Sequence, residues 1–388
     1  MNYLLFDGEE CKSLLPFTYT RPTSEIRVGI LTIREKWERH LGRTLSHITR
    51  AYLAHKYASH IETDNVIING AVIPNLAVLQ EIETMQKGES LVYNDIEIAW
   101  RSDKAQAEAM ISGERPFFKQ NKLKTDILIL QHPWQIFLWN GKLLNEDFDL
   151  LTVGRKTHPL NDSVRVLGHR PVFVEEGAEV SCAILNAHAG PIYLGKNSEV
   201  MEGAMIRGPF ALCEASQVKM GAKIYGDTTI GPYSKVAGEI SNSVIFGNSN
   251  KAHDGFVGNS VIGEWCNLGA DTNTSNLKNN YSAVRVWDIS TQTNIETGLQ
   301  FCGLLMGDHS KCGINTMFNT GTVVGVSANI FGGDFPPKYI PSFSWGGAAG
   351  LTIFRLDEAI KLATAVFHRR NRVFDENEKA IFEHLFGA

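Results

Sequence analysis

The sequence lacks any apolar run long enough to cross a membrane. None of its segments approaches the roughly 20 apolar residues that span a bilayer. It also lacks a start typical of a signal peptide, because no basic region precedes Tyr3–Phe6 and an acid, Asp7, follows at once. We expect Tyr3–Phe6 to be a buried strand that runs into a turn, and the protein to be cytoplasmic without a membrane partner.

Paired cysteines and an excess of positive charge are also missing. The six cysteines form no Cys-x-x-Cys pair and no metal-like spacing with histidine, which favours isolated reduced thiols. The net charge is −5, and lysine and arginine are dispersed along the chain. We expect no nucleic acid partner, since proteins that bind nucleic acids concentrate positive charge on one surface.

Glycine is abundant, with 35 residues that fall mostly in the second half, and that half also carries a six-residue repeat. Apolar residues recur at every sixth position in three blocks: Leu194, Val200, Ile206, Leu212, Val218, Ile224, Ile230 and Val236; Phe256, Ile262 and Leu268; Met306, Cys312, Phe318, Val324 and Ile330. An α-helix would place residues six apart on different faces, and a single strand would alternate every two residues, so neither explains this spacing.

The repeat predicts a left-handed parallel β-helix. In a triangular coil of three short strands, each six-residue side points one apolar residue inward and each coil covers the next. A sandwich of short strands is the alternative, and the sustained spacing disfavours it. Residues 237–255 and 270–300 break the period, and loops that leave such a coil often carry substrate contacts.

A chain of 388 residues is too long for one ordinary core, so we expect two domains and an appendage. We place an α/β domain at 1–130, a linker at 131–165 with a helix near 132–144, the β-helix at 166–335 and a helical cap at 336–388. The first domain should contain strands and one helical face: Tyr3–Phe6, Asn65–Asn69, Leu91–Tyr93, Ile127–Leu130, and Ile30, Ile33, Trp37 and Leu41 on the helix.

The cap should consist of two helices. Apolar residues at Leu356, Ile360, Ala363 and Phe367 have helical spacing, and a second helix should start at the capping box that Asp375 and Glu378 resemble. The simple interpretation is that these helices cover the open end of the coil. The alternative is that the basic stretch 368–372 contacts a ligand phosphate.

Two motifs resemble a known family. Leu15–Pro22 (LPFTYTRP), shortly after Phe6-Asp7-Gly8, resembles the opening motif of sugar-1-phosphate nucleotidylyltransferases. Asn250–Gly258 (NKAHDGFVG), followed by Asn267–Ala270 (NLGA), resembles the acetyltransferase site of the bifunctional N-acetylglucosamine-1-phosphate uridylyltransferase/glucosamine-1-phosphate acetyltransferase family. The resemblance implies a truncated, Rossmann-like nucleotidyltransferase domain followed by a hexapeptide-repeat acyltransferase domain.

The resemblance assigns roles to residues in the β-helix. It places His253 where the family keeps its general base, and imidazole, with an ordinary pKa near ~6.5, can remove a proton at neutral pH. It also places Lys251, Asn267 and Asn276 at the substrate site. The chain departs from the family at Phe256, where the family has an aromatic hydroxyl.

In the first domain the resemblance leaves Gly8, Lys12 and Arg21 as phosphate-binding candidates. The departures are larger here, because Glu9-Glu10 puts two negative charges beside Gly8 and Asn69 stands where a metal-binding acid is expected. Nucleotidyl transfer would require Mg²⁺ with an NTP. The metal ligands are not identified by the sequence.

The leading functional prediction is a transferase that moves an acetyl or other acyl group from acyl-CoA to a sugar phosphate or nucleotide sugar. One alternative is a sugar-1-phosphate nucleotidylyltransferase with a structural β-helix. Another is a non-catalytic scaffold that binds nucleotide sugars. The flat faces of a triangular coil pack well around a threefold axis, so the family resemblance also predicts a homotrimer.

Overall fold

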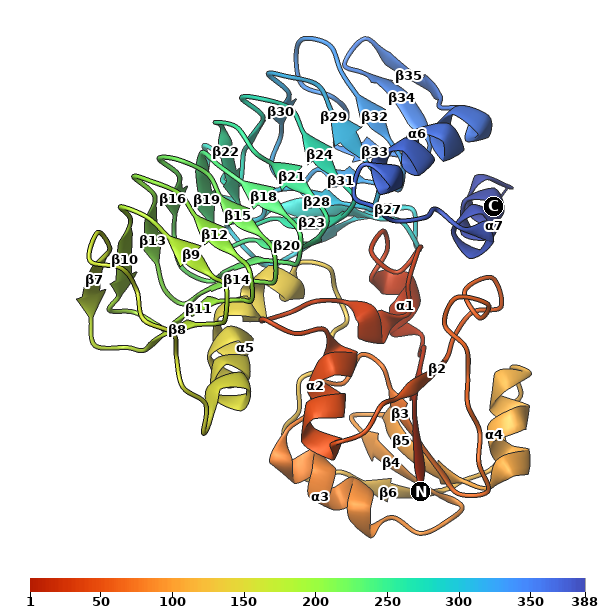
Figure 1. Ribbon diagram of the computed structural model, residues 1–388. Coiled ribbons are helices and arrows are strands. Elements are labelled where there is room, and N and C mark those ends of the chain that lie inside the picture. Colours follow the sequence, from red (N-terminus) through yellow and green to blue (C-terminus); the bar gives the residue numbers. More distant parts are fainter. Residues whose placement is uncertain (388) are drawn as a thin grey trace.

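The computed structural model describes residues 1–387 and contains an α/β domain, a β-helix and a C-terminal pair of helices (Figure 1). The first domain holds a six-stranded sheet in the order β2-β1-β3-β5-β4-β6. Its strands are β1 (Asn2–Phe6), β2 (Ser46–Ile48), β3 (Asn65–Asn69), β4 (Glu89–Tyr93), β5 (Ile96–Ser102) and β6 (Lys119–Lys122). The helices of the chain are α1 (Glu10–Ser13), α2 (Ile33–Leu41), α3 (Leu76–Thr84), α4 (Lys104–Ile111), α5 (Gln135–Thr152), α6 (Leu356–His368) and α7 (Glu376–Gly387).

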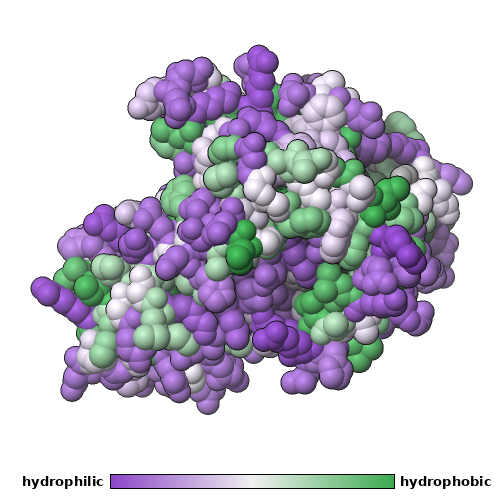
Figure 2. Space-filling view, turned by 90° about the horizontal axis from the view of Figure 1, so that it is seen from above, coloured by the Kyte–Doolittle hydropathy of each residue, from purple (hydrophilic) through white to green (hydrophobic). Residues whose placement is uncertain are grey.

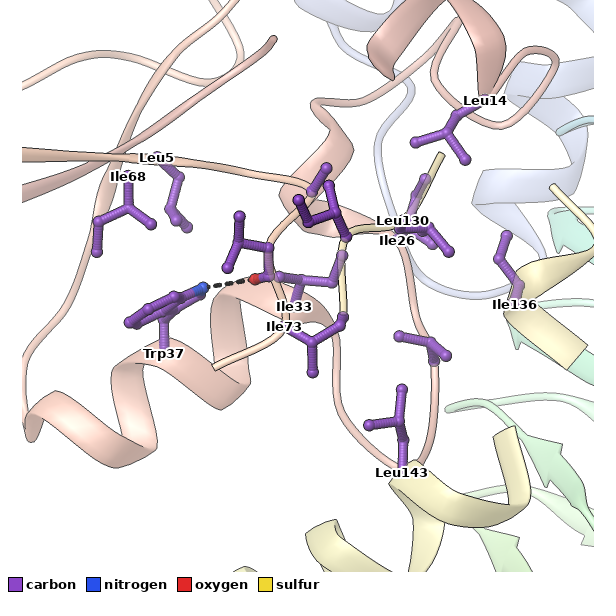
Figure 3. Packing of buried hydrophobic residues seen from close by; sticks show 14 of the residues in the cluster. Leu5, Leu14, Ile26, Ile33, Trp37, Ile68, Ile73, Leu130, Ile136 and Leu143 are labelled. Carbon is purple, nitrogen blue, oxygen red and sulfur yellow. Dashed lines mark hydrogen bonds between the residues drawn. The ribbon is translucent and has the colours of Figure 1, made fainter. Parts of the chain in front are cut away.

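The core of the first domain forms where α2 packs on the central strands. A capping box starts α2, because Thr32 accepts a hydrogen bond from Glu35 N and the Glu35 carboxylate accepts one from Thr32 N. Trp37 is fully buried, and its indole donates to the Val72 carbonyl at 2.9 Å. Figure 3 shows Trp37 beside Leu5 and Ile68 of the sheet, and Ile136 and Leu143 of α5 on the other side of the cluster. All five belong to one buried cluster, so one apolar core joins the domain to the linker helix.

Two expectations for this domain are corrected, and several elements were not predicted. Ile30 lies outside the helix, in the turn before the capping box, and packs against α5 instead. Ile127–Leu130 is no strand: it is an extended segment that bonds to Ala71 and Ile73 through single backbone hydrogen bonds. The strands β2, β5 and β6 were not predicted, and the linker helix runs on to Thr152.

The second half is a parallel β-helix, as the repeat predicts. Its strands stack into three long sheets, one for each side of the coil. The first holds β7 (Arg165–Gly168), β10 (Ile184–Ala187), β13 (Met205–Arg207), β16 (Lys223–Ile224), β19 (Glu239–Ser241) and β22 (Phe256–Gly258). The second holds β8 (Val172–Val174), β11 (Ile192–Leu194), β14 (Phe210–Leu212), β17 (Thr228–Ile230), β20 (Val244–Gly247), β23 (Val261–Glu264), β28 (Leu305–Met306), β31 (Val323–Val324) and β33 (Tyr339–Ile340). The third holds β9 (Glu179–Val180), β12 (Glu199–Val200), β15 (Gln217–Val218), β18 (Lys235–Val236), β21 (Asn250–Lys251), β24 (Asn267–Leu268), β29 (Lys311–Cys312), β32 (Asn329–Ile330), β34 (Ser344–Gly347) and an antiparallel β35 (Gly350–Ile353).

The interior of the coil is the apolar ladder that the repeat specifies. Leu194, Leu212 and Ile230 stack in register and are fully buried. The predicted register is wrong at one position, because Val257 rather than Phe256 pairs with Ile240 and joins the core. Residues 237–255 also stay within the coil, where shorter corners accommodate β19, β20 and β21.

The second irregular segment does leave the coil. After the short pair β25 (Asn273–Thr274) and β30 (Met317–Phe318), a hairpin of β26 (Arg285–Asp288) and β27 (Thr293–Glu296) projects from it. Val284 and Val286 from this segment belong to the same buried cluster as Phe17 of the first domain. The extruded segment therefore docks the two domains to each other.

Helices α6 and α7 lie along one edge of the coil rather than across its open end, which corrects the expected end cap (Figure 1). Arg370, which follows α6, donates to the carbonyl of Tyr233, a corner residue two coils before Trp265. Strands β33 and β34 continue the parallel pairing past the predicted limit of 335, and β35 turns back along β34. Phe367 of α6 stacks on Trp265 of the coil at 3.9 Å between ring centroids, and Phe343 belongs to the same buried cluster. Asp375 accepts a hydrogen bond from Glu378 N at 3.0 Å at the start of α7, as expected for an N-cap.

Polar contacts complete the docking of the first domain. Lys36 of α2 forms a buried ion pair with Asp147 of α5, and burial raises the pKa of this carboxyl while it lowers the pKa of the lysine. Lys56 reaches α7 through an ion pair with Glu378 at 2.8 Å. Within residues 1–387, none of the helices combines the length and apolarity needed to cross a bilayer.

Candidate functional site

His253 projects from a corner of the coil into solvent. The corner connects β21 to β22, and the His253 side chain is exposed. Within residues 1–387 no side-chain hydrogen bond holds the imidazole. The ring lines a groove of about 580 Å³ between the coil and the end of α6. A base at the rim of a solvent-accessible groove can meet a substrate without any rearrangement of the core.

The floor of the groove is a row of outward-pointing polar residues on the third sheet. Strand register places Lys235, Asn250, Asn267 and Lys311 side by side, each just before an inward residue of its own strand. The predicted substrate residue Asn267 is exposed within this row and lines the same groove as His253. The structure thus brings together two of the residues singled out by their motif.

Positive charge gathers on the walls of the groove. Arg369 and Arg370 come from the end of α6, and Arg370 donates to the Tyr233 carbonyl and to Asn250 Oδ1 at 2.7 and 3.0 Å. Burial lowers the pKa of Lys235, and the nearby cations Lys219, Arg370 and Arg369 lower it further. Burial likewise lowers the pKa of Lys311 to about 8. Cations that depress one another's pKa values favour an anionic ligand.

Sequence reasoning did not find Lys235 and Lys311. The signal for them is positional: each precedes an inward apolar residue of the repeat, Val236 and Cys312, in the same strand sheet as Asn267. Only the stacking of coils, which are separated by unequal lengths of chain, shows that these lysines flank one groove.

Figure 2 shows that the face seen from above is largely hydrophilic, with scattered apolar clusters.

The other two candidates in the β-helix lie outside the groove lining. Asn276 begins the extruded segment and donates to Asn259 Oδ1 at 2.8 Å. Lys251 points into the coil, is 1% exposed, and donates from Nζ to the carbonyls of His253 and Asp254. Burial lowers the pKa of Lys251 to about 8.

The phosphate-binding candidates of the first domain are engaged with neighbouring side chains. Lys12 is exposed and forms an ion pair with Glu9 at 2.7 Å. Beside Gly8, the Glu10 carboxylate fills the space that a Cβ would need and accepts hydrogen bonds from Asn69 Nδ2 at 3.3 and 3.4 Å. A carboxylate in this place would repel a phosphate.

Arg21 is a contact between the domains. Its buried guanidinium pairs with Asp308 of the β-helix, and Glu264 lies 3.4 Å away. Burial alone would lower the pKa of Arg21, but these two carboxylates raise it above its ordinary value. Among residues 1–387, no group of three or more His, Cys, Asp or Glu side chains is arranged to hold a metal ion.

The N-terminal part of the chain is similar to a known protein family. Residues 3–156 match the family described as sugar nucleotidyl transferase. The first domain is therefore similar to sugar nucleotidyl transferases. The chain is also 29% identical over 167 residues to the bifunctional protein GlmU of Methanocaldococcus jannaschii. The match covers 43% of this chain and 33% of that protein. It is 30% identical over 205 residues to a bifunctional sugar-1-phosphate nucleotidylyltransferase/acetyltransferase of Sulfurisphaera tokodaii, covering 52% and 44%.

These matches confirm the resemblance that the two motifs predict. In both, the chain spans less than half the length of the relative. Among solved structures, the polySia-specific acetyltransferase NeuO covers 54% of this chain and all of its own, at 15% identity and a TM-score of 0.31. The sugar nucleotidyl transferase domain and the β-helix together form the predicted architecture.

Proposed function

We propose that this protein transfers an acyl group from acyl-CoA to an amino or hydroxyl group of a sugar phosphate or nucleotide sugar, in the groove at His253. The observation that carries the proposal is the exposed imidazole at the rim of a groove walled by Lys235, Lys311, Arg369 and Arg370. CoA and sugar phosphates are both polyanions, which such a groove attracts. The relatives named as acetyltransferases support the same reaction class.

The chemistry follows from the position of His253. The imidazole would take the proton from the attacking amine or hydroxyl as that atom adds to the thioester carbonyl. The tetrahedral oxyanion would then collapse, break the carbon–sulfur bond and release CoA as a thiolate, to which the imidazolium returns its proton. Asn267, exposed on the floor of the groove, is placed to orient the acceptor sugar.

The first test measures thiol release from acetyl-CoA and longer acyl-CoAs against a panel of sugar phosphates and nucleotide sugars. We expect turnover with one acceptor class, and a rise in melting temperature with CoA that pantetheine, which lacks the nucleotide phosphates, does not produce. Arg369→Ala should reduce the CoA-induced rise. The absence of both turnover and CoA stabilisation would contradict the proposal.

The family of residues 3–156 favours a second function, in which the first domain transfers a nucleotidyl group from an NTP to a sugar-1-phosphate. Mg²⁺ would then be bound to the NTP. Of the phosphate-binding candidates, Lys12 pairs with Glu9 and Arg21 is buried against Asp308, so both would have to give up these partners to contact the phosphates. Pyrophosphate release in the presence of Mg²⁺ tests this function across NTPs and sugar-1-phosphates. If both assays fail while nucleotide sugars still bind, the protein is a non-catalytic scaffold.

We also propose a cytoplasmic homotrimer. An outward face of the coil exposes Ile184 of β10, Met205 of β13 and Tyr225, which follows β16; they are 37%, 45% and 44% accessible. Burying such a face against another copy would remove apolar surface from water. Light scattering tests the assembly, and a monomeric mass would contradict it.

A further inference from the structure

A lysine occupies a place inside the coil that aliphatic residues fill in the preceding coils. Strand pairing aligns Lys251 with Val236, and Val236 with Val218, on the inward side of the third sheet. Its side chain is only 1% exposed and stands among the largest fully buried side chains of the protein. Burying an ammonium is unfavourable unless its donors find acceptors. The position of Lys251 therefore calls for a function that valine could not perform.

The acceptors of Lys251 belong to the corner that carries His253. Nζ donates to the carbonyl oxygens of His253 and Asp254, both at 2.6 Å. Asp254 O also accepts the backbone N–H of Asp271 in the next coil, at 3.0 Å. One ammonium thus holds two successive peptide planes from inside the coil, while the side chains of those same residues point outward.

The next two coils hold the equivalent corner in another way. Four residues after the inward residue, Thr272 donates from its hydroxyl to the Gly269 carbonyl at 2.7 Å, and Thr316 donates to Gly313 O at 2.9 Å. At the His253 corner the equivalent position is Gly255. It has φ +112°, and a Cβ there would lie 2.2 Å from Thr272 O, so threonine does not fit. Lys251 instead bonds this corner from inside, at the carbonyls two and three residues after the inward position rather than one residue after it.

We propose that Lys251 is a positioning residue whose buried ammonium, bonded to the His253 and Asp254 carbonyls, fixes the corner that presents the imidazole. This inference rests on the proposed acyl transfer at His253. The imidazole has no side-chain partner within residues 1–387, so the direction of its Cα–Cβ bond is set by the backbone. A displacement of about 1 Å at a reacting group can lower a rate about 100-fold.

The variant Lys251→Met tests the proposal because it keeps the length of the side chain and removes the ammonium. Met suits an apolar interior, so the melting temperature should stay the same or rise. Amide hydrogen exchange in a peptide spanning 250–258 should become faster, while peptides from β9 to β16 keep their rates. In the acyl-transfer assay, kcat should fall by about tenfold or more with KM for acyl-CoA nearly unchanged. Val218→Met, which places the same side chain on the same inner face two coils earlier, is the matched control and should preserve exchange and kcat.

The two measurements separate the proposals. Unchanged exchange at 250–258 in Lys251→Met would overturn the anchoring role, whatever the activity. A fall in kcat accompanied by a matching fall in melting temperature would also overturn it, because that pattern belongs to general loss of packing. If the wild-type protein shows no acyl turnover, the proposed function fails, and the exchange measurement still decides whether Lys251 anchors the corner.

Discussion

The two halves of the molecule treat their polar side chains differently. In the sugar nucleotidyl transferase domain, the residues around the expected phosphate loop bond to one another: Lys12 to Glu9, and Asn69 to Glu10. In the β-helix, His253 and Asn267 remain exposed along a groove. The candidate residues of the first domain are therefore less available to a ligand than those of the β-helix.

The architecture explains the contrast. In the coil, inward residues make the core and the residues next to them form outward rows, so Asn250 and Asn267 can serve a ligand without weakening the fold. In the first domain the polar residues also dock one domain to the other, as Arg21 does through Asp308. A side chain that stabilises an interface is less available for chemistry.

The largest effect should come from His253→Ala. Loss of a general base lowers turnover by about 10²- to 10⁴-fold, and stability should change little because the ring is exposed. The measurement is kcat for thiol release at saturating acyl-CoA, with CoA-induced thermal stabilisation as the control for binding. Turnover close to that of the wild type would show that His253 is not the base. The contrast between an open site in the β-helix and an occupied one in the first domain would then no longer hold.

The interface should respond next, to Asp308→Asn. This change removes the buried carboxylate that pairs with Arg21 and leaves only the less buried Glu264, 3.4 Å away. Removing one partner of a buried pair costs up to about 3–5 kcal/mol of unfolding free energy. Urea denaturation measures it. Adding Arg21→Met should recover part of the loss, because it removes the unpaired charge. An unchanged urea midpoint would show that the contact between Arg21 and Asp308 does not stabilise the fold. Arg21 would then be available to bind a phosphate in the first domain.

The sequence predicted the features that a local pattern determines. The six-residue spacing identified the coil because each side of a coil admits one inward side chain, and the motif around His253 located a corner that faces a groove. The register slipped at Phe256, where a shorter corner makes Val257 the inward residue. In the first domain, Ile127–Leu130 has the composition of a strand but forms only isolated bonds to its neighbour.

What the sequence did not predict depends on distant segments. Lys235 and Lys311 line one groove only because the stacking of the coils places their strands in one sheet, with Asn250 and Asn267 between them. The interior position of Lys251 was also hidden, since a lysine is a natural candidate for binding substrate. The pairing of Arg21 with Asp308 joins residues of two domains. No local period carries such information.

A smaller effect should appear as pH falls, through the C-terminal cap. Burial among Trp265, Phe367 and Phe382 holds the pKa of His309 well below its usual value, and the nearby cations Lys311, Lys56 and Arg21 lower it further. At pH values below the ordinary pKa of histidine, near ~6.5, the unfolded chain binds a proton that the folded chain excludes. The free energy of unfolding therefore decreases as the pH is lowered.

For this one group, the free energy of unfolding should decrease by up to about 1.4 kcal/mol for each pH unit below the ordinary pKa. Melting temperatures between pH 7 and 5 measure it, with His309→Leu as the comparison. The variant removes the titrating group from the apolar cluster and should flatten the curve. Equal slopes in the two proteins would mean that His309 accepts its proton within the folded cap.

The smallest effect should come from Lys12→Ala. The ion pair between Lys12 and Glu9 is exposed, and such pairs contribute less than about 1 kcal/mol to unfolding free energy. We expect the variant to keep the thermal shift that an NTP produces with Mg²⁺, because the ammonium is already paired with Glu9. Thermal shift with and without NTP measures this directly. A lost NTP shift would identify Lys12 as a phosphate ligand, and the first domain would then be as open to its substrate as the groove at His253.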